Sequence, residues 1–144
     1  VQLQTAVAAA NHTANDLLLV DGGGNDAADL VGLYLATASG TPASVAAYNT
    51  VLKTVLPAAT VDATMFTATG APNPTGFAQV GGLYMTALAD SFYEQIKMHA
   101  LDKGAKQIAL INMPSIGLTP RFQEVLAGIA AAESAAKADR GARS

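Results

Sequence analysis

The residues of this chain whose types and spacing could do chemistry lie in one run, Asp16-Leu-Leu-Leu-Val-Asp-Gly-Gly-Gly-Asn-Asp26. Gly23 and Gly24 allow the backbone to turn sharply and to approach a ligand closely. Asn25 adds a side-chain amide that can donate hydrogen bonds, and Asp26 adds a carboxylate. The backbone N–H groups of a glycine-rich turn before a helix can also bind an anion such as phosphate. These residues therefore indicate either an anion-binding site or a tight turn in which Asn tolerates a left-handed conformation.

The elements around this run would place it at the edge of a parallel sheet. Residues 17–20 are four consecutive apolar residues, the pattern of a strand that is buried on both faces. The glycines follow the carboxyl end of this strand, and a helix is expected to begin near Ala27. In an open α/β sheet, ligands bind outside the carboxyl ends of the strands. The site is therefore expected at that edge.

A second buried strand is predicted at 107–111, and helical spacing of apolar residues fills most of the chain between and around the strands. Residues 1–10 carry such a pattern, whereas 58–73 have no clear period and are expected to form an irregular loop with one helical turn. This loop could shape a substrate lid. Three helices are expected where an N-cap residue precedes a proline at the first helical position, at Thr41-Pro42, Asn73-Pro74 and Thr119-Pro120.

The two predicted strands imply a parallel sheet, because helices separate them along the chain and parallel strands need such a crossover. They are expected to be neighbours or one strand apart, with both buried. Two strands alone do not make a stable doubly wound sheet. The missing strands must therefore come from another part of a longer chain or from another molecule.

The composition excludes several classes of protein. Hydrophobic residues make up 51% of the 144 residues and charged ones 13%, so the chain can bury the core of one domain. The net charge of −3 and the lack of a basic patch argue against a nucleic-acid partner. With no cysteine and two histidines, disulfides, thiolate nucleophiles and multi-histidine metal sites are excluded. No apolar run reaches the length of a transmembrane segment, and the natural start of the chain is expected upstream of Val1.

Two stretches of the chain resemble the SGNH (GDSL-type) hydrolases. The run Gly23-Gly24-Asn25-Asp26 after a hydrophobic strand is similar to the third sequence block of that family. The second stretch is similar to the segment that follows this block in the family, and it consists of Gly104-Ala105-Lys106-Gln107-Ile108, the rest of the strand, Asn112-Met113-Pro114 and Gly117-Leu118-Thr119-Pro120. The resemblance implies a flavodoxin-like three-layer α/β/α fold with a parallel sheet, of which this chain encodes a part. Residues 1–144 would then form one partial domain with its core at 1–132 and a frayed tail at 133–144.

The resemblance also implies an activity, the hydrolysis of carboxylic esters by a serine esterase or lipase. In that family the Asn of this block, here Asn25, donates its side-chain amide to the oxyanion hole. Gly23 and Gly24 would shape the turn, and Asp26 would support it by bonding backbone amides. No metal or organic cofactor is implied. The partners would be an ester substrate (a lipid or a small acyl ester) and the remaining segments of the hydrolase, and the location would be secreted, periplasmic or at the cell surface.

The other catalytic blocks of the family are missing from this chain. The nucleophile belongs to a Gly-Asp-Ser block after the first strand, and the closest match here, Ala89-Asp90-Ser91-Phe92, falls inside a predicted helix. The catalytic pair belongs to an Asp-x-x-His block, yet neither His12 nor His99 has an Asp three residues before it. The nucleophilic Ser and the base are therefore expected outside this chain, which alone would be inactive.

Two other functions remain open. One is a catalytically dead binding module, an SGNH-like scaffold that has kept the Asn turn without its nucleophile. The other is a phosphate-binding α/β protein that uses the backbone from Gly22 to Asn25 as an anion-binding nest.

Overall fold

The computed structural model describes residues 13–111 and, beyond them, 119, 120, 122–124, 126–128, 130, 131 and 134. The contacts divide the chain into two units, 1–111 and 112–144, and each is described by itself. The predicted helix at 1–10 and the whole run at 112–118 lie outside the described residues, and so does the predicted tail at 133–144 except for residue 134. In the second unit the described residues from 120 to 134 are helical, as Thr119-Pro120 predicts.

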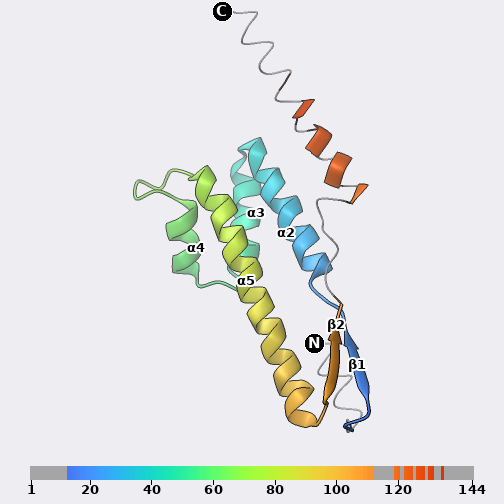
Figure 1. The fold of residues 1–144 in the computed structure, drawn as a ribbon. Coiled ribbons are helices and arrows are strands. Elements are labelled where there is room, and N and C mark those ends of the chain that lie inside the picture. Colours follow the sequence, from blue (N-terminus) through green and yellow to red (C-terminus); the bar gives the residue numbers. More distant parts are fainter. Residues whose placement is uncertain are drawn as a thin grey trace, which may run out of the picture. The chain divides into compact units, whose positions relative to one another are not determined.

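The first unit contains a two-stranded parallel sheet (Figure 1). β1 spans Leu17–Val20 and β2 spans Gln107–Leu110, with Leu17 paired to Gln107 and Val20 paired to Leu110. The N–H of Ile111 donates a hydrogen bond of 2.9 Å to the carbonyl oxygen of Val20, so the pairing continues past the end of β2. The predicted parallel pairing is confirmed, and the described residues form a mostly helical α/β structure.

Among residues 13–111, four helices lie between the two strands in the sequence. They are α2 (Gly24–Ala36), α3 (Pro42–Leu52), α4 (Ala58–Met65) and α5 (Pro74–His99), with short 3₁₀ turns η1 (Thr37–Ser39) and η2 (Leu101–Lys103). The start of α3 follows the predicted cap, because the side-chain oxygen of Thr41 accepts a hydrogen bond from the N–H of Ser44 and Pro42 is the first helical residue. Asn73 is the N-cap of α5 and Pro74 is its first residue, as predicted, although the Asn73 side chain makes no cap hydrogen bond.

α4 corrects part of the prediction for 58–73: residues 58–65 form an eight-residue helix where a single helical turn was expected, whereas 66–73 contain no helix, as predicted. The turns of α4 are stabilised by tertiary packing, since Val61 and Met65 lie one turn apart and are both fully buried. Gly76 of α5 makes this packing possible, because a side chain there would collide with the backbone of Thr64. A short segment with no clear apolar period gives little helical signal, whereas tertiary packing against α5 can still stabilise a helix.

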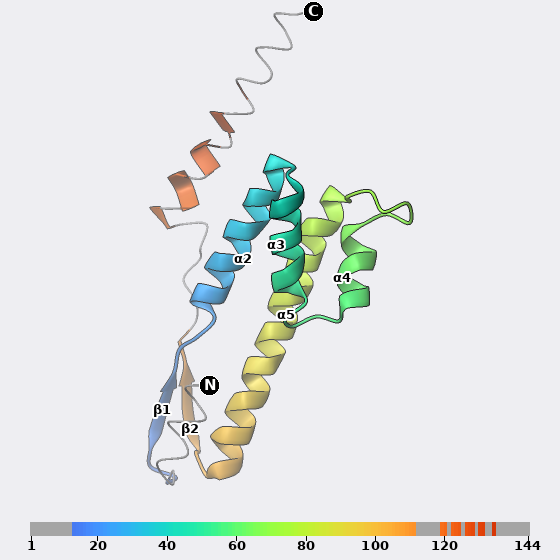
Figure 2. The same cartoon turned by 180° about the vertical axis from the view of Figure 1, so that it is seen from behind.

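Two hydrophobic clusters hold the unit together, and α5 belongs to both (Figures 1 and 2). The helical cluster lies where α2, α3 and α4 surround the N-terminal half of α5 and contains the buried residues Leu30, Tyr48, Leu52, Val61, Met65, Phe77, Val80 and Tyr84. The sheet cluster lies between the C-terminal half of α5 and the strands and contains the buried residues Val20, Ile96, Ala100 and Ala105. At 26 residues, α5 is about 39 Å long, which lets one helix serve both clusters.

The burial of both strands differs from the prediction. In β2 no residue is fully buried, and Gln107 and Leu110 at its ends are exposed. Val20 is buried and Leu18 packs against the sheet cluster, but Leu17 and Leu19 are 60% and 62% exposed. Alternate residues of a strand point to opposite faces, and α5 covers only the face of Leu18 and Val20. No element among residues 13–111 covers the opposite face of the sheet.

Candidate functional site

The turn between β1 and α2 is built on Gly23. This residue has φ 86°, in the left-handed region that glycine adopts without strain, and it is the N-cap of α2. Its carbonyl oxygen accepts a hydrogen bond of 2.9 Å from the N–H of Ala27, which closes the first turn of the helix. α2 begins at Gly24, which is three residues before the predicted start.

The turn lies at the carboxyl edge of the sheet. β1 and β2 are parallel, so both strands end at this edge, and the bond from Ile111 to Val20 joins their last residues. α2 starts at the same edge, with three residues between the end of β1 and its first residue (Figure 1). This is the edge where ligands bind in open α/β sheets. The first N–H groups of a helix lack intrahelical partners and carry a partial positive charge, so the start of α2 favours an anion.

Asn25 is the second residue of α2 and is exposed. Its side-chain amide has no hydrogen-bond partner among the described residues, which leaves it free to donate to a ligand. The structure thus places this predicted site residue at the carboxyl edge of the sheet, two residues after the left-handed Gly23.

Asp26 was expected to bond backbone amides of the turn. In the described part of the chain its carboxylate makes no hydrogen bond, and α2 has no side-chain cap. The carboxylate is exposed and lies in the first turn of α2, so its remaining contribution is a favourable interaction with the helix dipole.

The three glycines of the turn have different roles. A side chain at Gly24 would meet no atom within 4 Å, so no close contact in the described structure requires glycine there. A Cβ at Gly22 would instead come within 3.1 Å of Cε2 and Cζ of Phe92 in α5. Sequence reasoning missed this contact, because no local signal connects positions 70 residues apart. The apolar stripe of α5 indicates that Phe92 packs inward but does not say against what.

No catalytic serine and base meet in the part of the chain that the structure describes. Ser91 is exposed and lies inside α5, as predicted, and His99 lies eight residues later on the same helix, about 12 Å along its axis. This separation is too long for a hydrogen bond. The Nε2 atom of His99 is buried and has no hydrogen-bond partner among the described residues, and His12 lies outside them.

A hollow of about 480 Å³ lies at the other end of the helical layer. It is lined by Gly40, Pro42, Val45, Ala46, Asn49, Asp62, Phe66 and Pro72, which come from α3, α4 and the segments beside them. The 13 residues of α2, about 20 Å long, separate Gly40 from the glycine turn. The predicted lid segment at 58–73 therefore borders this hollow and lies away from the turn.

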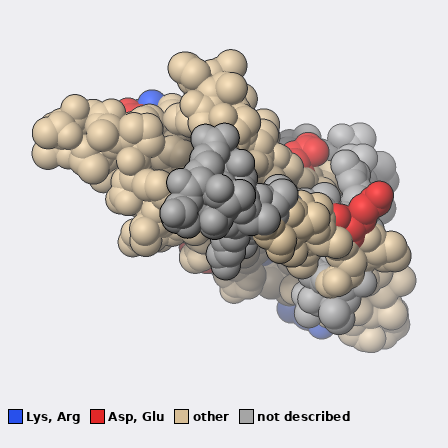
Figure 3. Space-filling model, turned by 90° about the horizontal axis from the view of Figure 1, so that it is seen from above, with Lys and Arg blue, Asp and Glu red and all other residues tan. Residues whose placement is uncertain are grey.

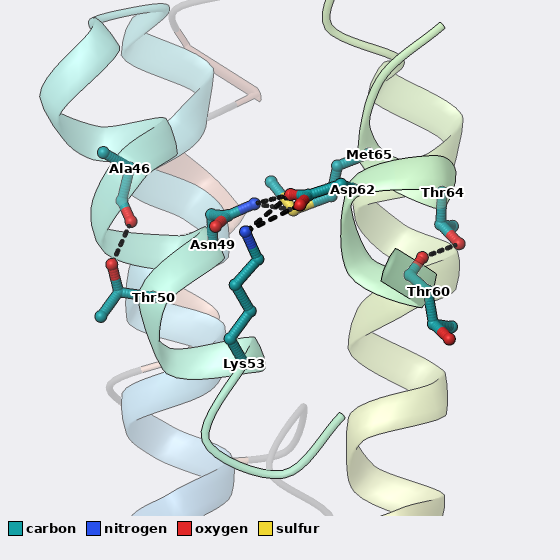
Figure 4. A network of polar contacts seen from close by, with 8 residues as sticks. All are labelled: Ala46, Asn49, Thr50, Lys53, Thr60, Asp62, Thr64 and Met65. Carbon is teal, nitrogen blue, oxygen red and sulfur yellow. Dashed lines mark hydrogen bonds and ion pairs between the residues drawn. The ribbon is translucent and has the colours of Figure 1, made fainter. Parts of the chain in front are cut away.

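Polar side chains beside this hollow join α3 to α4 (Figure 4). The ammonium of Lys53 lies 2.8 Å from Oδ1 of Asp62, and Asn49 donates a hydrogen bond of 3.0 Å to the same oxygen. The hydrogen bond from Lys53 and, to a lesser extent, the hydrogen bond from Asn49 lower the pKa of the Asp62 carboxyl group. These exposed groups neutralise each other and act as a link between two helices.

The described residues offer no other site of a recognisable class. They contain no group of three His, Cys, Asp or Glu residues that could hold a metal ion. None of the helices that the structure describes is both long enough and apolar enough to cross a membrane. On the face seen in Figure 3, basic side chains are sparse among the coloured atoms and form no patch.

No family model matches this sequence, and no curated protein or solved structure matches it.

Proposed function

We propose that this chain is the segment of an SGNH-type serine esterase or lipase that supplies the oxyanion-hole asparagine, Asn25. The observation that carries the proposal is the turn at Gly23. Its left-handed backbone places Asn25 in the first turn of α2, exposed and unpaired among the described residues, at the carboxyl edge of two parallel strands. The motif that resembles the third block of the family thus lies in a strand–turn–helix context suited to such a donor.

In the proposed reaction, a serine outside this chain attacks the carbonyl carbon of an ester, and a histidine outside this chain accepts the serine proton. The carbonyl oxygen becomes an oxyanion in the tetrahedral intermediate. Asn25 donates a hydrogen bond to this oxygen, and the positive end of the α2 dipole stabilises the same charge. The alcohol then leaves, and water releases the acid. The reaction needs no metal or organic cofactor.

Charge favours this proposal over phosphate binding. The exposed carboxylates of Asp21, Asp26 and Asp29 lie in or next to the turn in the sequence, and the first basic residue of the chain is Lys53. A phosphate site usually combines helix N–H groups with Lys or Arg. Bound phosphate would carry up to two negative charges beside these acids, whereas an oxyanion carries one charge and exists only transiently.

The proposed fold extends beyond the described residues. The exposed face of Leu17 and Leu19 is where a second helical layer of the three-layer fold would pack, and the two outer strand edges are where further strands would add. We therefore propose that the remaining segments of the hydrolase, or another chain, complete the sheet. The proposed enzyme belongs to the secreted, periplasmic or cell-surface class, with a lipid or a small acyl ester as substrate.

The test is the Asn25→Ala variant in the catalytically complete hydrolase that contains this segment. Hydrolysis of a p-nitrophenyl ester should lose about 10²–10³-fold in kcat, the usual cost of one oxyanion-hole donor, with little change in KM. The control is Asp26→Ala, which keeps the donor. Because the Asp26 carboxylate makes no hydrogen bond in the described structure, its removal should change kcat by less than about tenfold. An unchanged kcat in Asn25→Ala, measured on folded protein, would refute the proposal.

A further inference from the structure

Phe92 lies against the turn that carries the candidate site. A Cβ built on Gly22 would lie 3.1 Å from both Cε2 and Cζ of the Phe92 ring, closer than side-chain contacts normally come. The ring therefore occupies the space beside the Gly22 backbone, and the missing side chain of Gly22 is what allows it to do so. This contact joins the link between β1 and α2 to the C-terminal half of α5.

The ring is held in place by its own surroundings. Phe92 is partly buried and packs against the sheet cluster, together with Leu18 and Ile108. Farther toward its N-terminus, α5 packs in the helical cluster that also includes Leu30 of α2. α5 is thus fixed against the strand before the turn and against the helix after it.

The turn itself has few other restraints. The link from β1 to α2 is only Asp21, Gly22 and Gly23, and no side chain caps α2. Within the described residues, its backbone is held by the bond from Ala27 to Gly23 and by the bond from Ile111 to Val20. Gly23 is conformationally free, since glycine adopts many backbone states at similar energy. A ring packed on the neighbouring residue limits that freedom.

We propose that Phe92 is a positioning residue for the glycine turn, which it holds through Gly22 so that Asn25 is presented at the carboxyl edge of the sheet. The role of Asn25 in this inference rests on the proposed function, whereas the contact between Phe92 and Gly22 does not. A methyl group at Gly22 must displace the ring or the turn by a few tenths of an ångström. Catalysis is sensitive to such shifts, because a misplacement of 1 Å can cost about 100-fold in rate.

The first test uses the 144-residue chain and the exchange rate of the Ala27 amide, whose hydrogen bond to Gly23 closes the turn. Gly22→Ala and Phe92→Leu should each speed this exchange about tenfold through local opening. The double variant should exchange more slowly than Gly22→Ala, because leucine leaves room for the added methyl group. Phe77→Leu is the matched control, since Phe77 lies on the same helix but in the helical cluster, and it should leave the exchange within about twofold.

The second test measures ester hydrolysis by the complete hydrolase that contains this segment. Gly22→Ala should lower kcat about tenfold or more with little change in KM, and the double variant should recover part of that loss. Unchanged Ala27 exchange in both single variants, or equal changes in Phe77→Leu, would overturn the positioning role. If Ala27 exchange responds as expected while kcat does not, the positioning role stands and the proposed function of the turn fails.

Discussion

The hydroxyl group of Tyr48 donates a hydrogen bond of 2.9 Å to the carbonyl oxygen of Phe77, and this buried bond joins α3 to the first turn of α5. Gly81 leaves room for it, because a side chain there would come within 2.6 Å of the hydroxyl oxygen. Burial and, to a lesser extent, the nearby Tyr34 raise the pKa of Tyr48 to about 12. The core therefore contains a phenol that must stay neutral.

This pKa predicts a loss of stability at alkaline pH. Because the pKa is raised in the folded state, the stabilising contribution is complete below pH 10 and is lost as the pH rises toward 12. The free energy of unfolding, measured by urea titration, should fall across this window and fall less steeply in Tyr48→Phe. Tyr93→Phe is the control, since that side chain is 56% exposed and should leave the slope unchanged. Equal slopes in all three proteins would contradict the prediction.

The two glycines that precede Asn25 should respond to alanine in opposite ways. Gly23→Ala forces a side chain into the left-handed region at φ 86° and should cost about 1–2 kcal/mol in the free energy of unfolding. Gly24 begins the helix in open space, so Gly24→Ala should be neutral or stabilising by up to about 1 kcal/mol. Chemical denaturation of both variants checks the signs. An equal loss in the free energy of unfolding for Gly24→Ala and Gly23→Ala would contradict the open space around Gly24.

The 144-residue chain alone should not hydrolyse esters. Ser91 lies within α5, about 12 Å along the helix axis from His99, and the described residues provide no other serine with a base in reach. Turnover of a p-nitrophenyl ester by the purified chain should equal that of buffer, and Ser91→Ala should make no difference. Activity that survives repurification and disappears in Ser91→Ala would show that this serine is the nucleophile.

The exposed leucines of β1 should drive association. Leu17 and Leu19 form an apolar face with no cover among residues 13–111, and such faces promote contact with another polypeptide. Sedimentation velocity should therefore show association of the chain. Replacing both leucines by threonine should weaken this association with little loss of stability, because both side chains are already exposed.

Leu18→Thr is the matched control for the leucine pair, since Leu18 points to the face covered by α5. It should lower the free energy of unfolding by about 1–3 kcal/mol through lost burial and should leave the association unchanged. A stable, monodisperse monomer of the unaltered chain would count against the predicted partner.

The sequence by itself determined the elements whose signals are local. Four apolar residues at 17–20 and the mostly apolar run at 107–111 predicted two parallel strands, and proline after Thr41 predicted the start of α3. The glycine run predicted a sharp turn at the carboxyl edge, with Asn25 beside it. These predictions held because strand formation, capping and left-handed glycine depend on residues close together in the chain.

Tertiary structure decided the features that depend on contacts between distant residues. α4 exists because Val61 and Met65 reach the core and Gly76 lets two backbones approach, which the pattern of 58–73 does not reveal. Leu17 and Leu19 are exposed because α5 covers only one face of the sheet. Gly22 is contacted by a ring 70 positions away, whereas Gly24 faces open space. Side-chain packing has no period in the sequence, so only the folded chain shows which glycine of the turn is constrained by a neighbour.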